Sequence, residues 1–241
     1  MSRFYVALPL AVGSTVDLPE AVAHHVHVVR LAPGDVITLF NGEGGEYTAV
    51  LASVEKRRAS AEIKAHTARD TELPYAITLA QALPEGTKMD WIIEKAVELG
   101  VAAVQPLAAR RCVVRLSGER AEKKLGHWQA VIVAASEQSG RNRLARLAPL
   151  EDYKDWIAQN DLHRRVILTP RATESLASWA RHQPPQALTI MVGPEGGFSD
   201  EEEQAALAQG ALALSMGPRV LRTETAALAA LAALNASWGG M

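Results

Sequence analysis

The chain has 241 residues, of which 48% are hydrophobic and 22% are charged, and its formal net charge is −2 at pH 7. This composition is typical of a globular protein with an aliphatic core, and it excludes collagenous, disordered and membrane-spanning chains. Because aromatic residues make up only 5% and the charge is slightly acidic, neither extensive base stacking nor a uniformly basic surface is expected.

The cysteine content and the first residues bear on the compartment. Cys112 stands alone, which excludes an intrachain disulfide and a cysteine-rich zinc site. The segment at residues 1–6 lacks the apolar core of a secretory leader, and no stretch has the length and hydropathy of a membrane span. We therefore expect a cytoplasmic protein without membrane association.

The first 72 residues have the pattern of a small β domain. Strands are expected over residues 3–8, 36–40, 46–51 and 58–65, and a helix over residues 20–30. The string Asn-Gly-Glu-Gly-Gly at residues 41–45 is a strong hairpin signal. Short strands joined by tight turns predict a small barrel. The helix carries three histidines, but no acidic or cysteine partner has ligand spacing, so no metal site is expected.

The pattern changes at Pro74, and residues 73–241 alternate between strands and helices. Strands are expected over residues 75–80, 101–107, 165–169, 188–192 and 211–215. Helices are expected over residues 88–99, 120–139, 200–209 and 223–238. Ser199 with Glu202 forms a capping-box signal before the third of these helices. This alternation predicts a parallel α/β sheet.

Two glycine-proline motifs follow predicted strands. Residues 193–198 read Gly-Pro-Glu-Gly-Gly-Phe, and residues 217–226 read Gly-Pro-Arg-Val-Leu-Arg-Thr-Glu-Thr-Ala. Ligands bind beyond the C-terminal ends of parallel strands, where small residues and free backbone N–H groups allow close approach. Neither motif is a phosphate-binding Walker loop or a dinucleotide fingerprint, so a smaller ligand with an adenosine part remains open. Two purely structural turns are the alternative.

Several polar residues flank these motifs. Thr223 is expected to cap the last helix, which places Arg222 at the junction of loop and helix. Gly140 is a natural end for the long helix, and Arg141 beyond it either complements the helix C-terminus or forms a basic lip over an anionic substrate. No catalytic triad or carboxylate pair can be assigned. The carboxylates that could each act as a base are Glu98, Glu137, Glu195 and Glu224.

Taken together, these strings resemble the ribosomal RNA small subunit methyltransferase E family, a member of the knotted SPOUT superfamily. Residues 90–101 and 137–141 add to the two motifs, while residues 27–35 and 40–44 match the family's PUA-like barrel. The resemblance covers nearly the whole chain. The family commonly has serine at the position of Cys112 and a proline near Ala145, and both departures lie outside the two motifs.

The resemblance implies an α/β fold, with a C-terminal trefoil-knotted SPOUT methyltransferase domain at residues 73–241 and an N-terminal PUA-like RNA-binding β-barrel at residues 1–72. It also implies a homodimer through the C-terminal domain. The cofactor would be S-adenosyl-L-methionine, held by Leu168, Thr169, Gly193, Pro194, Glu195, Gly196, Gly197, Ser215, Met216, Gly217, Pro218, Leu221 and Thr223.

The implied reaction is methylation of N3 of a uridine in 16S ribosomal RNA of the 30S subunit. Uridine N3 must lose its proton, and the resulting charge spreads to O2 and O4, so the site needs cations and a proton acceptor. Arg222 is the first choice for the cation and Arg141 the second, and Glu195 or Glu224 would accept the proton. The residues expected to contact RNA are His27, Arg30, Arg111, Arg141, Arg143 and Arg219.

Three other functions stay open at this point. A SPOUT-type methyltransferase acting on transfer RNA would share the fold and the cofactor. A non-catalytic RNA-binding factor in ribosome assembly would not bind the cofactor. An enzyme acting on a small molecule with an adenine-containing ligand would have no affinity for RNA.

Overall fold

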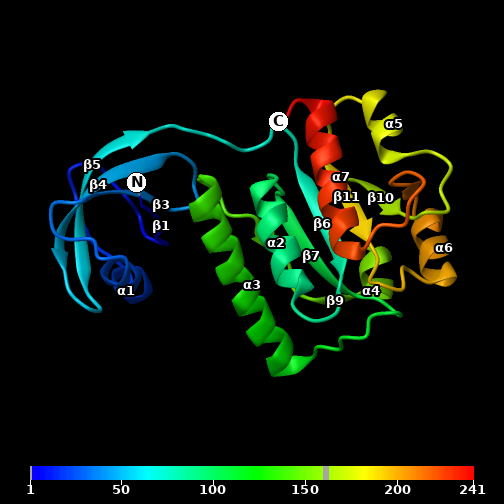
Figure 1. Cartoon of the computed structure of the whole chain (residues 1–241), viewed down its shortest axis with the longest axis horizontal. Coiled ribbons are helices and arrows are strands. Elements are labelled where there is room, and N and C mark those ends of the chain that lie inside the picture. Colours follow the sequence, from blue (N-terminus) through cyan, green and yellow to red (C-terminus); the bar gives the residue numbers. More distant parts are fainter. Residues whose placement is uncertain (1, 160–162) are drawn as a thin grey trace. The chain divides into compact units, whose positions relative to one another are not determined.

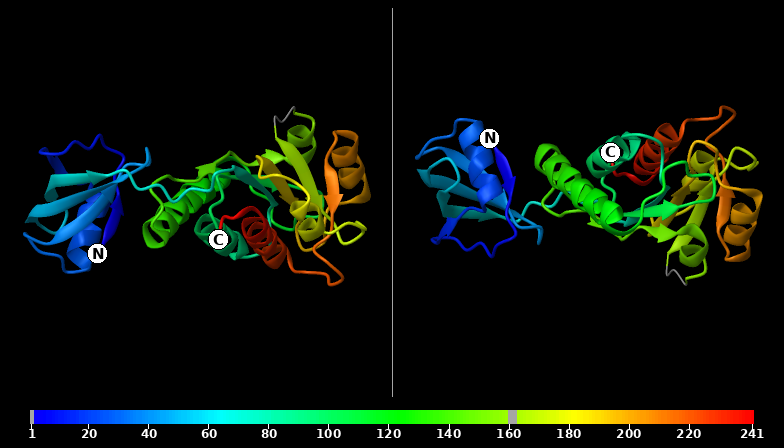
Figure 2. Two further views of the ribbon diagram at one scale, coloured as in Figure 1. Left: turned by 90° about the horizontal axis from the view of Figure 1, so that it is seen from above. Right: turned by 90° about the horizontal axis from the view of Figure 1, so that it is seen from below.

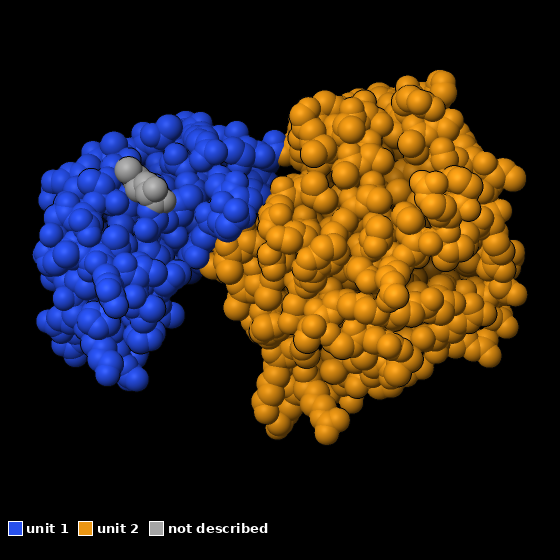
Figure 3. All heavy atoms as spheres, in the orientation of Figure 1, with its two compact units in different colours: residues 1–72, 136–144 blue, residues 73–135, 145–241 orange. Residues whose placement is uncertain are grey.

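The computed structural model describes residues 2–159 and 163–241. The elements follow the chain as labelled in Figure 1, with two further views in Figure 2, and they form two compact units (Figure 3). Unit 1 contains the residues up to Glu72 together with Ser136–Leu144, and unit 2 contains Leu73–Ala135 and Ala145–Met241. The second segment of unit 1 begins in the last turn of the long helix, α3 (Gly118–Ser139), and is not signalled by the sequence pattern.

Unit 1 is a five-stranded sheet with one helix. Its elements are β1 (Arg3–Tyr5), β2 (Thr15–Asp17), α1 (Glu20–Val28), β3 (Val36–Phe40), β4 (Glu46–Val54) and β5 (Ala59–Thr67). The strand order is β1-β3-β4-β5-β2, with β1 parallel to β3 and the other pairs antiparallel. No ladder joins β1 to β2 within the described ranges. The backbone ladders therefore do not close the sheet into the predicted barrel. The two edge strands, β1 and β2, are only three residues long.

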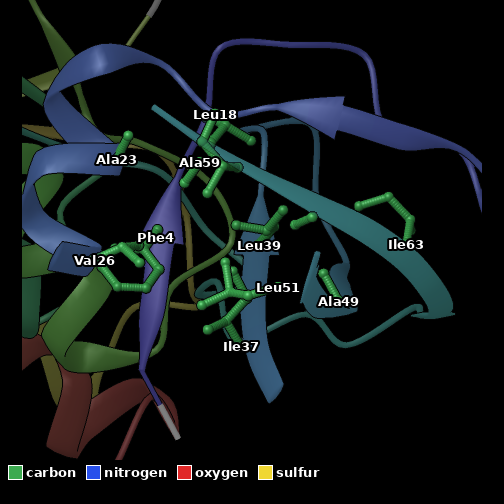
Figure 4. Close-up of a cluster of buried hydrophobic side chains, with 12 residues drawn as sticks. Phe4, Leu18, Ala23, Val26, Ile37, Leu39, Ala49, Leu51, Ala59 and Ile63 are labelled. Carbon is green, nitrogen blue, oxygen red and sulfur yellow. The ribbon is translucent and has the colours of Figure 1, made fainter. Parts of the chain in front are cut away.

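The core of unit 1 is an aliphatic cluster formed by the sheet and α1 (Figure 4). Ile37 and Leu39 lie two residues apart on β3, so both point to the same face of the sheet. They are fully buried together with Phe4 from β1, Leu51 from β4 and Val26 from α1. Burial of such side chains is the main stabilising contribution in a domain of this size.

Charged side chains attach the segment Ser136–Leu144 to the strands of unit 1. Arg3 forms an ion pair with Glu46 at 2.5 Å and also donates to the Asn142 side chain at 2.5 Å. The backbone N–H of Tyr5 donates to the Glu137 carboxylate at 2.8 Å. The bonds to Asn142 and Glu137 join partners more than 130 positions apart in the chain, so local sequence signals do not reveal them.

Unit 2 is built on a seven-stranded sheet. Its strands are β6 (Ile77–Ala82), β7 (Ala103–Ala108), β8 (Arg146–Leu147), β9 (Glu151–Asp152), β10 (Arg164–Leu168), β11 (Leu188–Val192) and β12 (Leu212–Leu214). The order is β12-β10-β11-β6-β7-β8, with β9 also paired to β7, and every ladder is parallel. Every residue of β11 is buried, as expected for the centre of a parallel sheet. The predicted parallel α/β sheet is confirmed.

The helices of unit 2 pack against this sheet and against each other. They are α2 (Lys88–Glu98), α3 (Gly118–Ser139, whose last residues belong to unit 1), α4 (Tyr153–Ile157), α5 (Leu176–Arg181), α6 (Asp200–Ala208) and α7 (Thr223–Trp238). Helix α7 contacts β6, β11, α2 and α5, whereas α4 contacts α6, β7 and β9. None of the helices described reaches both the length and the hydropathy needed to cross a membrane.

The predicted bounds agree best at two apolar strands and at the long last helix. The strands at 36–40 and 188–192 and the helix at 223–238 coincide with β3, β11 and α7. The pattern does not reveal β2, β8, β9, α4 or α5, each of which has six residues or fewer. Such segments are too short for a helical or alternating period to be recognised.

The predicted capping box at the start of α6 is present and invites a direct test. Ser199 Oγ accepts from the Glu202 N–H at 3.2 Å, and the Glu202 carboxylate accepts from the Ser199 N–H at 2.8 Å. We expect Ser199→Ala to lower the free energy of unfolding by about 1 kcal/mol, whereas Ser199→Thr retains the cap and changes it less. Urea denaturation measures both, and equal stability of Ser199→Ala and the unsubstituted protein would contradict the cap.

Candidate functional site

A cavity of about 460 Å³ lies at the C-terminal ends of β10, β11 and β12. Its walls come from residues 168–170 after β10, residues 192–197 after β11, and Met216, residues 219–223 and Ala226 around the start of α7. These segments meet because β10 lies between β12 and β11 in the sheet. The volume suits a small organic ligand, and the position matches the usual binding edge of a parallel sheet.

Glycine is required by geometry in both motifs. A Cβ on Gly193 would lie 2.8 Å from the backbone nitrogen of Phe198, so only glycine permits this close approach of two backbone segments. The Gly197 N–H donates to the Pro194 carbonyl at 2.8 Å and closes the turn. Gly217 has a φ of +94°, a region that residues with a Cβ rarely adopt. The glycines therefore shape the loops whether or not a ligand is present.

Thr223 joins the two motifs instead of capping α7. Its buried hydroxyl donates to the Gly193 carbonyl at 2.6 Å and accepts from the Gln81 amide at 3.0 Å. The N-cap residue of α7 is Arg222, and it makes no side-chain capping bond. The predicted capping role of Thr223 is wrong, because its side chain turns inward to satisfy a buried carbonyl on β11's loop.

Most of the residues predicted to hold a cofactor line this cavity. They are Leu168, Thr169, Gly193, Pro194, Glu195, Gly196, Gly197, Met216, Leu221 and Thr223. Ser215, Gly217 and Pro218 are not among the lining residues. Ser215 turns toward the loop before α5, where its hydroxyl donates to the Glu174 carbonyl at 3.2 Å.

Further lining residues were missed by the sequence analysis. They are Pro170, Val192, Val220 and Ala226. Val192, Val220 and Ala226 adjoin or lie within the two motifs, and Pro170 follows Thr169, so adjacency was the available signal. All four are apolar, and with the backbone groups of the loops they make walls suited to a flat, weakly polar ring system.

Two cations brace the loop at residues 193–197 from outside the cavity. Arg111 donates from Nη1 to the carbonyls of Gly196 at 2.8 Å and Phe198 at 3.1 Å, so the structure uses this predicted RNA contact to hold the loop. Lys88, at the first position of α2, pairs with Glu195 at 2.5 Å. No sequence motif marks Lys88, because its partner lies 107 positions away.

Two arginines at the cavity are available to a ligand. Arg219 and Arg222 are exposed and line the cavity. Neither guanidinium group forms an ion pair or hydrogen bond with any residue in the described ranges 2–159 and 163–241. Val220 between them is 83% exposed. This stretch therefore presents two uncompensated positive charges and one apolar side chain.

Arg141 has a different environment from the one predicted. Its side chain is 5% exposed, and its Nε donates to the Glu72 carboxylate at 3.1 Å, with a second bond from Nη2 to the other carboxylate oxygen. It belongs to unit 1 and is not among the residues that line the cavity. A buried, bidentate ion pair is a structural arrangement, so the exposed basic lip is not observed.

Of the four candidate carboxylates, Glu195 lines the cavity. Burial opposes its ionisation, but the bonds from Lys88 and the Glu85 backbone N–H outweigh burial and lower the pKa of Glu195 below its usual range. Glu224 is not a lining residue, and its Oε2 is buried without a hydrogen-bond partner in the described chain. Glu98 pairs with Lys95 at 2.7 Å, and Glu137 accepts from Tyr5.

The other residues predicted to contact RNA lie in unit 1. His27 near the end of α1 and Arg30 just after it are both exposed, and Arg30 has a φ of +61°. Arg143 is also exposed and lies beside Gly44, where an added Cβ would approach its guanidinium to 2.7 Å. No three described histidine, cysteine or acidic side chains gather as a metal ion would require.

Two family models match separate parts of the chain. Residues 71–235 match a family model described as an RNA methyltransferase domain. Residues 18–64 match a model described as an RNA methyltransferase PUA domain. The first match contains every residue that lines the cavity.

Individual relatives match over nearly the full length. Ribosomal RNA small subunit methyltransferase E from Bacillus subtilis is 34% identical over 223 residues, covering 90% of this chain and 87% of that protein. The crystal structure of the protein of the same name from Neisseria gonorrhoeae, bound to S-adenosyl methionine, is 43% identical with a TM-score of 0.93, covering 99% and 98% of the two chains. A Legionella pneumophila methyltransferase in complex with the same cofactor is 36% identical with a TM-score of 0.93, covering 98% and 97%.

The bond between Thr223 and Gly193 can be tested by a nearly isosteric change. Thr223→Val removes the hydroxyl and leaves the buried Gly193 carbonyl and Gln81 amide without this partner, so we expect the free energy of unfolding to fall by about 1–3 kcal/mol. Thr223→Ser retains the hydroxyl and is the matched control. Chemical denaturation followed by tryptophan fluorescence compares them, and a Thr223→Val variant as stable as the unsubstituted protein would contradict the role of the hydroxyl.

Proposed function

The chain belongs to the ribosomal RNA small subunit methyltransferase E family, and from this membership we propose that it transfers the methyl group of S-adenosyl-L-methionine to N3 of a uridine in 16S ribosomal RNA. That it is an RNA methyltransferase follows from the family. The observation that supports the proposed methyl transfer is the cavity at the strand ends. Two family motifs enclose this cavity, and Thr223 joins the two motifs.

The residues around the cavity fit this cofactor. The apolar walls formed by Leu168, Val192 and Leu221 suit the adenine ring, and the backbone edges of the glycine loops can hydrogen-bond its nitrogens. A Cβ on Gly193 would collide with the backbone of Gly197 and Phe198. The loop can therefore keep this shape only with glycine at position 193. Two solved relatives were crystallised with this cofactor. When bound, the cofactor supplies an electrophilic methyl group.

The unpaired arginines provide the cations that the reaction needs. Uridine becomes nucleophilic at N3 only after deprotonation, and the negative charge then spreads to O2 and O4. Arg222 and Arg219 line the cavity, and their guanidinium groups have no partner among the described residues, so they can donate to these oxygens. Arg222 remains the first choice, because it stands at the start of α7 next to Thr223. Arg141, tied to Glu72, is the weaker choice.

The proton from N3 passes to a carboxylate or to water. Glu195 faces the cavity, but the bonds that lower its pKa make it a weak proton acceptor. Glu224 has a carboxylate oxygen without a partner among the described residues, although it does not line the cavity. Both therefore remain candidates, with Glu195 also able to orient a cation.

The remaining expectations extend the same proposal. We place RNA recognition on unit 1, where His27, Arg30 and Arg143 expose polar side chains. We also propose that unit 2 adopts the trefoil-knotted SPOUT arrangement, that two copies associate through the C-terminal domain, and that the protein acts in the cytoplasm. The match to an RNA methyltransferase PUA domain supports the role of unit 1.

Nucleoside mass spectrometry tests the proposal directly. Unmodified 30S subunits are incubated with the purified protein and S-adenosyl-L-methionine, and 16S ribosomal RNA is then digested. We expect a 3-methyluridine peak that is absent without the protein. No peak, while an established enzyme modifies the same particles, would reject the proposal, and a peak from transfer RNA alone would move the substrate to that class.

Substitution of the two candidate arginines separates catalysis from folding. We expect Arg222→Ala to lower the methylation rate by roughly 10²–10³-fold, as loss of one donor to a developing anion does, and to change stability by less than about 0.5 kcal/mol. Arg141→Ala leaves Glu72 without its partner and should destabilise the protein by about 3 kcal/mol. Single-turnover kinetics and urea denaturation are measured on both variants, and a near-normal rate for Arg222→Ala with normal cofactor affinity would remove it from the mechanism.

A further inference from the structure

Lys88 lies among carboxylates from both glycine-proline motifs. It pairs with Glu195 of the first motif at 2.5 Å, and the two side chains are 29% and 31% exposed. The bond to Glu195 is the main reason that the pKa of Lys88 is raised, with burial opposing it and the charges of Glu224 and Glu85 adding to it. Lys88 therefore stays protonated. From the start of α2 it forms an ion pair with Glu195 of the first motif and is attracted by the charge of Glu224 in the second.

Glu195 is held through one of its two carboxylate oxygens. Oε1 accepts from Lys88 Nζ and from the Glu85 backbone N–H at 3.1 Å. No donor from another residue in the described ranges reaches Oε2. One oxygen is thus used for attachment, which leaves the other for a ligand in the cavity that Glu195 lines.

The cavity is lined by charges of both signs. Glu195 is the acidic residue among those that line it, whereas Arg219 and Arg222 are the basic ones. Around Lys88, the three carboxylates of Glu195, Glu85 and Glu224 face one ammonium group. A cationic ligand is therefore attracted to the Glu195 side and repelled by the two arginines.

The proposed cofactor and its product differ in this property. S-adenosyl-L-methionine carries a sulfonium and an ammonium against one carboxylate, so its net charge is positive. S-adenosylhomocysteine has lost the methyl group and the sulfonium charge, and its net charge is zero. An anion fixed in the cavity wall therefore favours the cofactor over the product, while contacts to adenine and ribose are the same for both.

Resting on the proposed function, we propose that Lys88 is a positioning residue that holds the Glu195 carboxylate at the cavity wall, where it selects the cationic S-adenosyl-L-methionine over the neutral S-adenosylhomocysteine. Lys88 acts through Glu195 and does not itself contact the ligand. This selection favours replacement of spent product by fresh cofactor between turnovers.

Isothermal titration calorimetry on the full chain at pH 8 tests this selection with both ligands. We expect Glu195→Gln to weaken binding of S-adenosyl-L-methionine about five- to tenfold and to change binding of S-adenosylhomocysteine less than about twofold, since tenfold corresponds to one good charge interaction. Lys88→Met should have the same selective effect, and Lys88→Arg should restore much of the preference.

The sign of the Lys88→Met result distinguishes positioning from simple proximity of charge. If Lys88 were only a nearby cation, its removal would strengthen binding of the cationic ligand. Loss of a positioning residue weakens it, because Glu195 is no longer held. Circular dichroism checks that each variant is folded, and Glu195→Gln tests the same selection if Lys88→Met fails to fold.

Acidification gives a second readout that a purely structural role would not change. The bonds to Lys88 and Glu85 lower the pKa of Glu195. The other charged groups nearby are Glu85 and Glu224, which interact with Lys88, and Arg219 and Arg222, which line the same cavity. Without Lys88 the carboxylate protonates at higher pH, so Lys88→Met should lose cofactor affinity on acidification before the unsubstituted protein does. Affinity for S-adenosylhomocysteine should not follow this trend.

The outcomes separate the two proposals. An unchanged ratio of the two affinities in both Glu195→Gln and Lys88→Met would overturn the inference while leaving the proposed function intact. Failure of the unsubstituted protein to bind S-adenosyl-L-methionine would instead reject the proposed function. A selective loss in Glu195→Gln but a gain in Lys88→Met would retain the role of Glu195 and overturn that of Lys88.

Discussion

The hydrogen bond from the Thr223 hydroxyl to the Gly193 carbonyl is the contact on which the cavity depends. Loops made of glycine and proline have few side chains of their own to hold them, so their shape must be fixed from outside. Thr223 supplies this from the first turn of α7, whose other contacts with β6 and β11 anchor the helix on the sheet. The bond therefore transmits the position of a large packed helix to a turn that has no core of its own.

Several basic residues of this structure hold loops or neighbouring segments in place. Arg111 and Lys88 contact the first loop, Arg141 pairs with Glu72 in unit 1, and Arg171 joins the loop after β10 to Asp200 of α6 at 2.7 Å. A cation with fixed protein partners is desolvated and oriented, and it has less capacity left for a ligand. The side chains of Arg219 and Arg222 lack such partners among the described residues, and this absence distinguishes them from these four cations.

The sequence predicted the parts of the fold that depend on periodicity and failed where distant contacts decide. The strands β3 and β11 follow from short apolar runs and the helix α7 from helical spacing, which are local properties. Thr223 has the residue type of a helix cap and stands at the correct position for one, but a buried carbonyl 30 positions earlier takes its hydroxyl. Arg141 likewise stands where a cation would complement the C-terminus of a helix, but its side chain is buried and pairs with Glu72.

The surroundings of Thr223 show that the protein accepts an energetic cost next to the cavity. A hydroxyl has one proton, and Thr223 gives it to Gly193, so only a donor can satisfy the remaining lone pairs. The Gln81 amide is that donor, but its carbonyl oxygen is then buried without a partner in the described chain. A glutamate there would compete for the hydroxyl proton and release Gly193, while a leucine would leave Thr223 unsatisfied. The unpaired oxygen is thus the consequence of directing the single proton of Thr223 toward the loop, and the direction of that proton fixes the cavity wall.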